Sequence, residues 1–259
     1  MKKFILIFAL IFFVGCMQNT TNVGRSEVDR TQLMLISSDE INEASAKAYG
    51  EVIEKAKASN TLNKDPKLTN RVKNISNRLI AKTSYFRQDS TKWDWEINVI
   101  TSDTINAWCM AGGKIAVYTG IIEKLNLNDD EIAFILAHEI AHALREHVRE
   151  QQSQEMIKSG LINVASVFGV DNTILGVANL AANVGISLPF SRSHENESDE
   201  IGLELAYMAG FNPDGAASLW MKMQEHSGDG GLEFLSTHPS HENRIKNLQA
   251  LAAKLKASS

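Results

Sequence analysis

The feature that most constrains this chain is a pair of histidines four residues apart inside a helix-forming stretch. His138 and His142 would lie about 40° apart around a helix axis, so both imidazoles can face one ion. Glu139 follows the first histidine and is well placed to hold a water molecule on such an ion. Asn128 as N-cap and Glu131 at the capping-box position predict that this helix begins at Asn128. This spacing favours a metal site over a structural histidine pair.

A catalytic zinc site needs a third protein ligand and one open position. Downstream, the stretch 191–199 offers three candidates: His194, Glu195 and Glu197. We take Glu195 as the ligand, because Asp199 lies four residues further along the same helical face and can orient a metal-bound histidine through its other ring nitrogen. If this stretch were only an acidic, solvent-exposed helix start, Glu197 would be explained. The metal would then lack its third protein ligand.

Hydrophobic periodicity outlines an α+β chain that is mainly helical, with a small sheet beside the histidine-bearing helix. Helices are predicted over 39–57 and 65–82, and alternating residues predict strands over 93–101 and 114–119. Between the strands, Gly112 and Gly113 indicate a turn within 106–113. After Asn128 the pattern is helical, and 241–256 forms a closing amphipathic helix.

The N-terminus reads as a processing segment. Lys2 and Lys3 precede an apolar run over 4–14, so we expect a signal peptide over 1–15. The ending Phe13-Val-Gly-Cys16 resembles a bacterial lipobox, which makes Cys16 the expected lipidation site; the alternative is an ordinary signal peptide with an incidental cysteine. The polar segment 16–38 is predicted to be a flexible tether, and 39–259 a single domain.

The composition excludes several classes of binding partner and of structural site. Lys and Arg total 26 against 31 Asp and Glu, and no basic run could hold a phosphate backbone, so no nucleic-acid partner is expected. Two cysteines, Cys16 and Cys109, are too few for a disulfide scaffold or a cysteine-based zinc site. The weakly charged stretch 161–190 is broken near Asp171, which favours core helices or a lid over membrane insertion.

Four ordered motifs give the chain a specific resemblance. They are Asn106-Ala-x4-Gly-Gly-Lys-Ile-x-Val-x-Thr-Gly120, His138-Glu-x-x-His142, Ser191-Arg-x-x-Glu195-x3-Asp199 and Ser236-Thr-His238-Pro-Ser-x3-Arg244-Ile. Together they resemble the HtpX-like, CAAX-prenyl-protease-type zinc metallopeptidases, and most of all the BepA-like and LoiP-like members. Ala111 departs from the pattern, because many relatives carry proline there. The resemblance implies a zincin-like gluzincin fold, one Zn²⁺ held by His138, His142 and Glu195, and endopeptidase activity.

Roles for the remaining residues follow from this reading. Glu139 is the expected general base, and His238 and Arg244 are candidate oxyanion donors. His238 could instead fill the open metal position as an inhibitory latch. The strand 114–119 could receive an extended substrate or be an ordinary sheet edge. His147, His226 and His241 are expected on the surface.

The expected function is therefore zinc-dependent hydrolysis of peptide bonds on the periplasmic side of a bacterial envelope. The resemblance points to misfolded or misassembled envelope proteins as substrates, including unfolded outer-membrane proteins. Met17, rather than aspartate, after the lipidated cysteine resembles outer-membrane sorting. A competing interpretation is a lipid-anchored chaperone or assembly factor with a structural or latent zinc site, and a weaker one is a zinc-storage module. Glu139 argues against the first, because a structural site needs no general base, and a closed four-ligand site would serve zinc storage better.

Overall fold

The computed structural model describes residues 16–158, 189–226, 233–239 and 243–257. It is an α+β fold dominated by helices, as the sequence predicted. The helices are α2 (Ser38–Ala58), α3 (Pro66–Ile80), α4 (Thr119–Lys124), α5 (Asp129–Leu144), α6 (His147–Lys158), α8 (Arg192–Met208), α9 (Asp214–His226), α10 (Glu233–Thr237) and α11 (Arg244–Ala257). Two short 3₁₀ helices, η1 (Thr83–Tyr85) and η2 (Gln88–Lys92), connect α3 to the sheet.

Local sequence signals set where several helices begin. The Asp65 side chain accepts hydrogen bonds from the first turn of α3, with Pro66 at the first helical position. At the start of α5, the Asn128 side chain and Glu131 form the reciprocal capping box expected from the sequence. The chain therefore fixes the start of the histidine-bearing helix locally, ten residues before His138.

The main sheet has three strands in the order β3-β5-β4: β3 (Glu96–Ile100), β5 (Lys114–Tyr118) and β4 (Ala107–Met110). β3 pairs parallel to β5, and β4 pairs antiparallel to it. The prediction for 106–113 was incomplete, since only Ala111, Gly112 and Gly113 form the turn, with φ of 76° at Gly112 and 85° at Gly113. The strand β4 was missed because all four of its residues are buried, so it shows no polar alternation.

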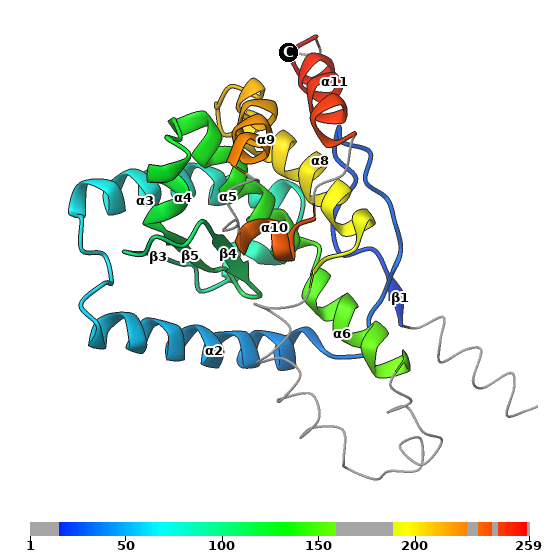
Figure 1. The fold of residues 1–259 in the computed structure, drawn as a ribbon. Helices are drawn as coiled ribbons and strands as arrows, with labels where there is room; N and C mark the ends of the chain where they lie inside the picture. The colour runs from blue at the N-terminus through cyan, green and yellow to red at the C-terminus, as the bar shows by residue number, and fades with distance from the viewer. Residues whose placement is uncertain (1–15, 159–188, 227–232, 240–242, 258–259) are drawn as a thin grey trace, which may run out of the picture.

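Helices cover both faces of this sheet (Figure 1). On one face, α2 packs through Tyr49 and Ile53 against Trp108 and Met110 of β4. The other face contributes Ile115 and Val117 of β5 to the main core, which α3, α5, α8 and α9 share. β4 is thus the sheet edge that lies against α5 and its histidines.

Two backbone features near α5 decide how the site is assembled. A side chain at Gly202 of α8 would place its Cβ 2.8 Å from the His138 nitrogen, so only glycine permits this approach of the two helices. The helix α5 ends at Leu144, earlier than the sequence pattern indicated, and Glu146 adopts a positive φ of 51°. The chain turns there, and His147 begins α6.

The segment 16–37 differs from the flexible tether that its composition predicted. β1 (Met17–Gln18) pairs with β2 (Gln32–Leu33), and Val28, Met34 and Ile36 are buried against the domain. Arg30 donates from Nη1 and Nη2 to the two oxygens of Glu150 at 2.5 and 2.7 Å, and it also binds Glu197. Gln32 is fully buried and bonds to the Arg145 carbonyl and to Glu150. Arg30 and Gln32, which the composition placed in a solvated tether, instead contact the buried carboxylates of Glu150 and Glu197.

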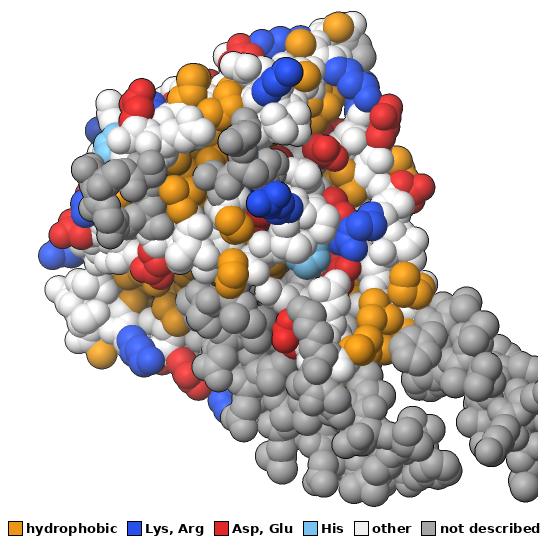
Figure 2. Space-filling model, turned by 45° about the vertical axis from the view of Figure 1, so that its right-hand side comes forward, with side chains coloured by type: hydrophobic (Ala, Val, Ile, Leu, Met, Phe, Trp, Pro, Cys, Tyr) orange, Lys and Arg blue, Asp and Glu red, His pale blue; other side chains and the backbone are white. Residues whose placement is uncertain are grey.

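None of the helices in the described ranges is long and apolar enough to cross a membrane. The predicted signal peptide over 1–15 and most of the apolar stretch 161–190 lie outside the described residues. On the face drawn in Figure 2, acidic and basic side chains are interspersed with scattered hydrophobic ones. Cys109 is buried and Cys16 is partly exposed, and both are free thiols.

Candidate metal centre

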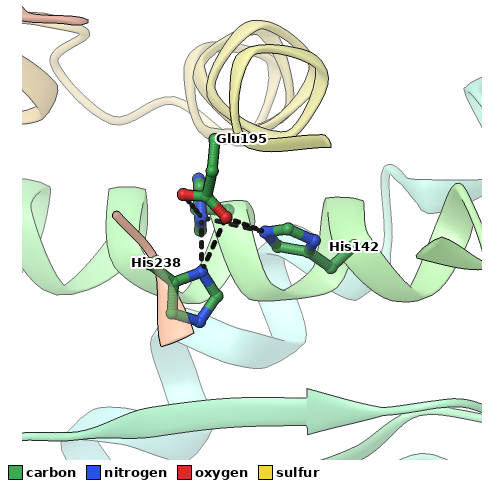
Figure 3. Close-up of side chains that lie close together, drawn as sticks. His142, Glu195 and His238 are labelled. Carbon is green, nitrogen blue, oxygen red and sulfur yellow. Dashed lines mark hydrogen bonds and ion pairs between the residues drawn. The ribbon is translucent and has the colours of Figure 1, made fainter. Parts of the chain in front are cut away.

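Four side chains, from two helices and from the residue that follows a third, meet in the protein interior. His138 and His142 belong to α5, Glu195 to the first turn of α8, and His238 follows directly after α10. Figure 3 shows His142, Glu195 and His238 pointing toward one another. The two histidine Nε2 atoms are 3.1 Å apart, and Glu195 Oε1 lies 3.3 Å from His142 Nε2. All four side chains are buried, and Glu195 is fully inaccessible to solvent.

The separations among these donor atoms fit one tetrahedral ion. Ligand atoms about 2.0–2.1 Å from a tetrahedral zinc lie roughly 3.3 Å from one another. Besides the two contacts above, His238 Nδ1 lies 3.1 Å from Glu195 Oε1 and 3.4 Å from His138 Nε2. Imidazole nitrogens that face one another through their lone pairs need a shared cation or an added proton. The donor set of histidines and a carboxylate is one that zinc accepts.

Glu195 is held as a carboxylate with one oxygen turned toward the histidines. Burial by itself raises the pKa of Glu195, but His238 and the hydrogen bonds from His142 and His238 bring that pKa well below its ordinary value. Its second oxygen, Oε2, accepts a 2.7 Å hydrogen bond from Arg244 Nη1. Arg244 therefore fixes which Glu195 oxygen faces the histidine pair.

Arg244 is committed to carboxylates, which changes the role that the sequence suggested for it. Its Nε and Nη2 atoms each donate to Asp199 at 2.6 Å, and the guanidinium stacks 3.7 Å above the Trp220 ring. These bonds, together with the one to Glu195, occupy the guanidinium, so the expectation that Arg244 acts as an oxyanion donor is not supported. The structure makes it a positioning residue for two acidic side chains.

Asp199 lies on the far side of His138 from the donor cluster. Its Oδ1 is 3.0 Å from His138 Nδ1, although the contact is not as straight as an ideal hydrogen bond. Burial raises the pKa of Asp199, but the adjacent Arg244 charge brings that pKa below its ordinary value, so the group is ionised. An ionised carboxylate at Nδ1 favours the His138 tautomer whose Nε2 lone pair faces the cluster.

Glu139 occupies a separate position at the edge of the cluster. It is buried, and among the described residues its Oε1 has no hydrogen-bond partner; His238 Nε2 is 3.4 Å away. Burial raises the pKa of Glu139, and the adjacent His238 opposes the rise. Glu139 and His142 line a small pocket with Trp108 of β4, Phe190 and His238. An unsatisfied carboxylate oxygen facing such a pocket suits a proton acceptor.

His238 lies within reach of the cluster, as both of its predicted roles, oxyanion donor and inhibitory latch, require. Its ring stacks on Phe234 at a centroid separation of 4.3 Å, and Phe190 stacks on His142 at 4.0 Å. These two aromatic contacts set the orientation of the His238 and His142 rings. No sequence motif indicated that Phe190 or Phe234 would lie beside them. In this arrangement Nδ1, not Nε2, of His238 faces the other donors.

The alternatives for the third ligand lie elsewhere. His194 Nε2 contacts Glu150 at 3.2 Å, and Glu197 bonds to Arg145 at 2.8 Å. Of the three histidines expected on the surface, His147 is fully buried, which corrects that prediction. His226 is half-buried and contacts the Lys222 carbonyl, while His241 lies outside the described residues.

Comparison with known proteins identifies the family. The family model "Peptidase family M48" matches residues 66–252, which is more than half of the chain. The chain belongs to this family. That membership confirms the metallopeptidase resemblance and the zincin-like fold class expected from the four motifs.

Three relatives illustrate the range of the similarity. The chain is 37% identical to the mitochondrial metalloendopeptidase OMA1 of Schizosaccharomyces pombe over 60% of this chain and 46% of that protein. It is 31% identical to the human metalloendopeptidase OMA1, over 61% and 32% of the two chains. It is 27% identical to the beta-barrel assembly-enhancing protease of Yersinia pestis over 79% and 43%. The chain therefore spans less than half the length of each of these relatives.

The geometry predicts that Arg244→Leu destabilises the fold even without metal. The substitution leaves Glu195 and Asp199 as buried carboxylates without their cation, which costs about 3–5 kcal/mol. Urea denaturation of the chelator-treated protein measures this loss. Lys256→Ala is the matched control on the same helix, because Lys256 forms an exposed ion pair with Asp214. A metal-free stability close to wild type for Arg244→Leu would contradict the assigned role.

Proposed function

We propose that the protein is a zinc-dependent endopeptidase of the bacterial cell envelope. The observation that carries the proposal is the convergence of His138 Nε2, His142 Nε2 and Glu195 Oε1, with the unsatisfied oxygen of Glu139 beside them. Membership of peptidase family M48 supports the reaction class. A structural metal site would not need a buried carboxylate whose free oxygen faces a pocket.

The residues divide the work of peptide hydrolysis. His138, His142 and Glu195 would hold Zn²⁺. Asp199 fixes the orientation of His138, and Arg244 fixes that of Glu195. When bound, zinc supplies Lewis acidity that brings the pKa of a coordinated water toward about 7 and polarises the scissile carbonyl. Glu139 accepts the proton of the attacking water at its free Oε1 and returns it to the leaving amine.

The peptide substrate is best accommodated along β4. The sequence singled out 114–119 for this role, but β5 is the central strand of the sheet and both of its edges are paired. Among the described residues β4 pairs only with β5, so its other edge has no neighbouring strand. Ala107, Trp108 and Cys109 of β4 line the pocket that contains Glu139. An extended polypeptide added to that edge would bind through main-chain hydrogen bonds, which require little sequence preference.

Envelope localisation rests on Cys16 and on the likeness to an envelope protease. The segment after Cys16 is packed rather than loose: the Met34 N–H donates to the Cys16 carbonyl at 2.8 Å, directly before β1. A lipid on Cys16 would therefore hold the catalytic domain next to the bilayer, with outer-membrane sorting as the expected address. One relative is a beta-barrel assembly-enhancing protease, which supports unfolded outer-membrane proteins as the substrate class.

We expect Glu139→Gln to retain zinc and to lose peptide hydrolysis. The amide keeps the shape of the side chain but cannot accept the proton, so turnover of an unfolded model protein should fall by about a hundredfold or more. Elemental analysis and a protease assay measure the two effects, with the exposed Glu123→Gln as control. Full activity of Glu139→Gln would favour the chaperone or assembly-factor interpretation, whereas a zinc-free wild type would remove the metal site itself.

For His238, the proposal is an inhibitory latch whose Nδ1 completes the donor set. His238→Ala should then raise hydrolysis or self-cleavage, because a water can take the position that the imidazole held. An oxyanion donor makes the opposite prediction, a fall in turnover by roughly tenfold to a thousandfold. Initial rates with one unfolded substrate distinguish the two, and a decrease would contradict the latch.

Cys16→Ser should release the protein from the membrane fraction or leave the signal segment uncleaved. A lipid chain attached to this residue is the only membrane anchor that the proposal contains. Cell fractionation and intact-mass measurement test it, with Cys109→Ser as the matched cysteine control. An unchanged mass together with unchanged fractionation would show that Cys16 carries no lipid.

A further inference from the structure

His147 contacts the metal centre from behind one of its ligands. On a continuous helix it would lie about 140° around the axis from His142, facing elsewhere. The turn at Glu146 ends α5 and brings the His147 ring back, so that its Nδ1 lies 2.9 Å from His142 Nδ1. On its opposite side, His147 Nε2 lies 3.1 Å from Glu197 Oε2.

The protons in this contact have one consistent arrangement. Both rings are buried, and a neutral imidazole carries its single N–H on one of its two nitrogens. Because His142 turns its Nε2 toward the other donors, its single N–H is on Nδ1. That N–H donates to the Nδ1 lone pair of His147, whose own N–H on Nε2 then donates to Glu197. The Ser198 hydroxyl, 3.3 Å from His147 Nδ1, lies beside the same lone pair.

We propose that His147 is a positioning residue for His142, and that it transmits the orienting effect of the Glu197 carboxylate through its ring. The inference rests on the proposed metal site. It gives each metal-facing histidine a carboxylate behind it: Asp199 contacts His138 directly, and Glu197 reaches His142 through one intervening imidazole. Such outer partners fix the tautomer and ring angle of a ligand histidine and raise its basicity.

Arginines from two separate segments hold Glu197 in place. Arg145 Nε donates to Glu197 Oε2 at 2.8 Å, directly after α5 ends. Arg30 of the N-terminal segment binds both oxygens of Glu197 and both oxygens of Glu150. The segment 16–37 therefore supplies the outermost residue, Arg30, of a hydrogen-bond network that leads through Glu197 and His147 to His142.

The same region does not favour a second metal ion. Ligand atoms of His147, Glu150 and His194 lie within 4.8 Å of one another. However, both Glu150 oxygens already accept hydrogen bonds from Arg30, and Gln32 adds another. A divalent cation here would face the Arg30 and Arg145 guanidinium groups at close range, and that repulsion is unfavourable in a buried site.

The test is zinc affinity, measured by competition with a chromophoric chelator on the purified full chain. His147→Leu removes both hydrogen bonds and should weaken zinc binding by about tenfold to a hundredfold. His147→Asn can keep an acceptor for His142 but not the bond to Glu197, so its affinity should lie between those of wild type and His147→Leu. Glu197→Gln, which keeps the histidine, should also weaken binding and serves if His147→Leu does not fold.

His194→Asn is the control for general packing effects. His194 is buried and stacks on His147 at a centroid separation of 4.4 Å, but its Nε2 contacts Glu150 rather than a candidate ligand. Its zinc affinity should stay within about threefold of wild type. The visible spectrum of the Co²⁺-substituted protein should change in His147→Leu and not in His194→Asn, because it reports ligand geometry.

Two results would overturn the inference. One is a wild-type zinc affinity in both His147→Leu and Glu197→Gln, and the other is an equal loss in His194→Asn. Both leave the metal site standing, because wild type still binds zinc. A wild type that binds no zinc would instead remove the proposed function, and this inference would fail with it.

Discussion

The structure depends on neutralising carboxylates that are taken out of water. Glu195 is fully buried, and Asp199, Glu197 and Glu150 are nearly so. An isolated buried carboxylate is so unfavourable that each must have a cation or several hydrogen bonds. Arg244 serves Glu195 and Asp199, while Arg145 and Arg30 serve Glu197 and Glu150. The remaining Glu195 oxygen faces the histidines, and it is there that the proposed zinc ion would complete the charge balance.

This requirement ties distant parts of the chain to one helix. Arg30 comes from the N-terminal segment, Arg145 from the junction after α5, and Arg244 from the first turn of α11. All three reach acidic residues in the first half of α8, or Glu150 beside it on α6. Gly202 lets α8 lie against α5 closely enough for Glu195 and Asp199 to contact the histidines. Helix packing and charge compensation therefore support one another, and neither would place the donor atoms alone.

The pocket beside the metal centre shows a second division of labour. The helix α5 carries His138, Glu139 and His142, whereas His238 follows α10 and Phe190 precedes α8. The Phe190 N–H donates to the Thr237 carbonyl at 2.9 Å, so the residues before α8 and after α10 contact each other beside the pocket. The residue proposed as a latch therefore comes from outside the two helices that carry the proposed ligands.

The sequence by itself determined what local chemistry encodes. The cap at Asp65, the capping box at Asn128 and the His138-Glu139-x-x-His142 spacing act within one helix, so they could be predicted without tertiary contacts. Only the tertiary structure decided the rest. The strand β4 is buried on both faces and shows no alternation, and His147 faces the site because of a single left-handed residue at Glu146. Arg30 and Gln32 resemble tether residues until their buried partners, more than a hundred residues away, are in place.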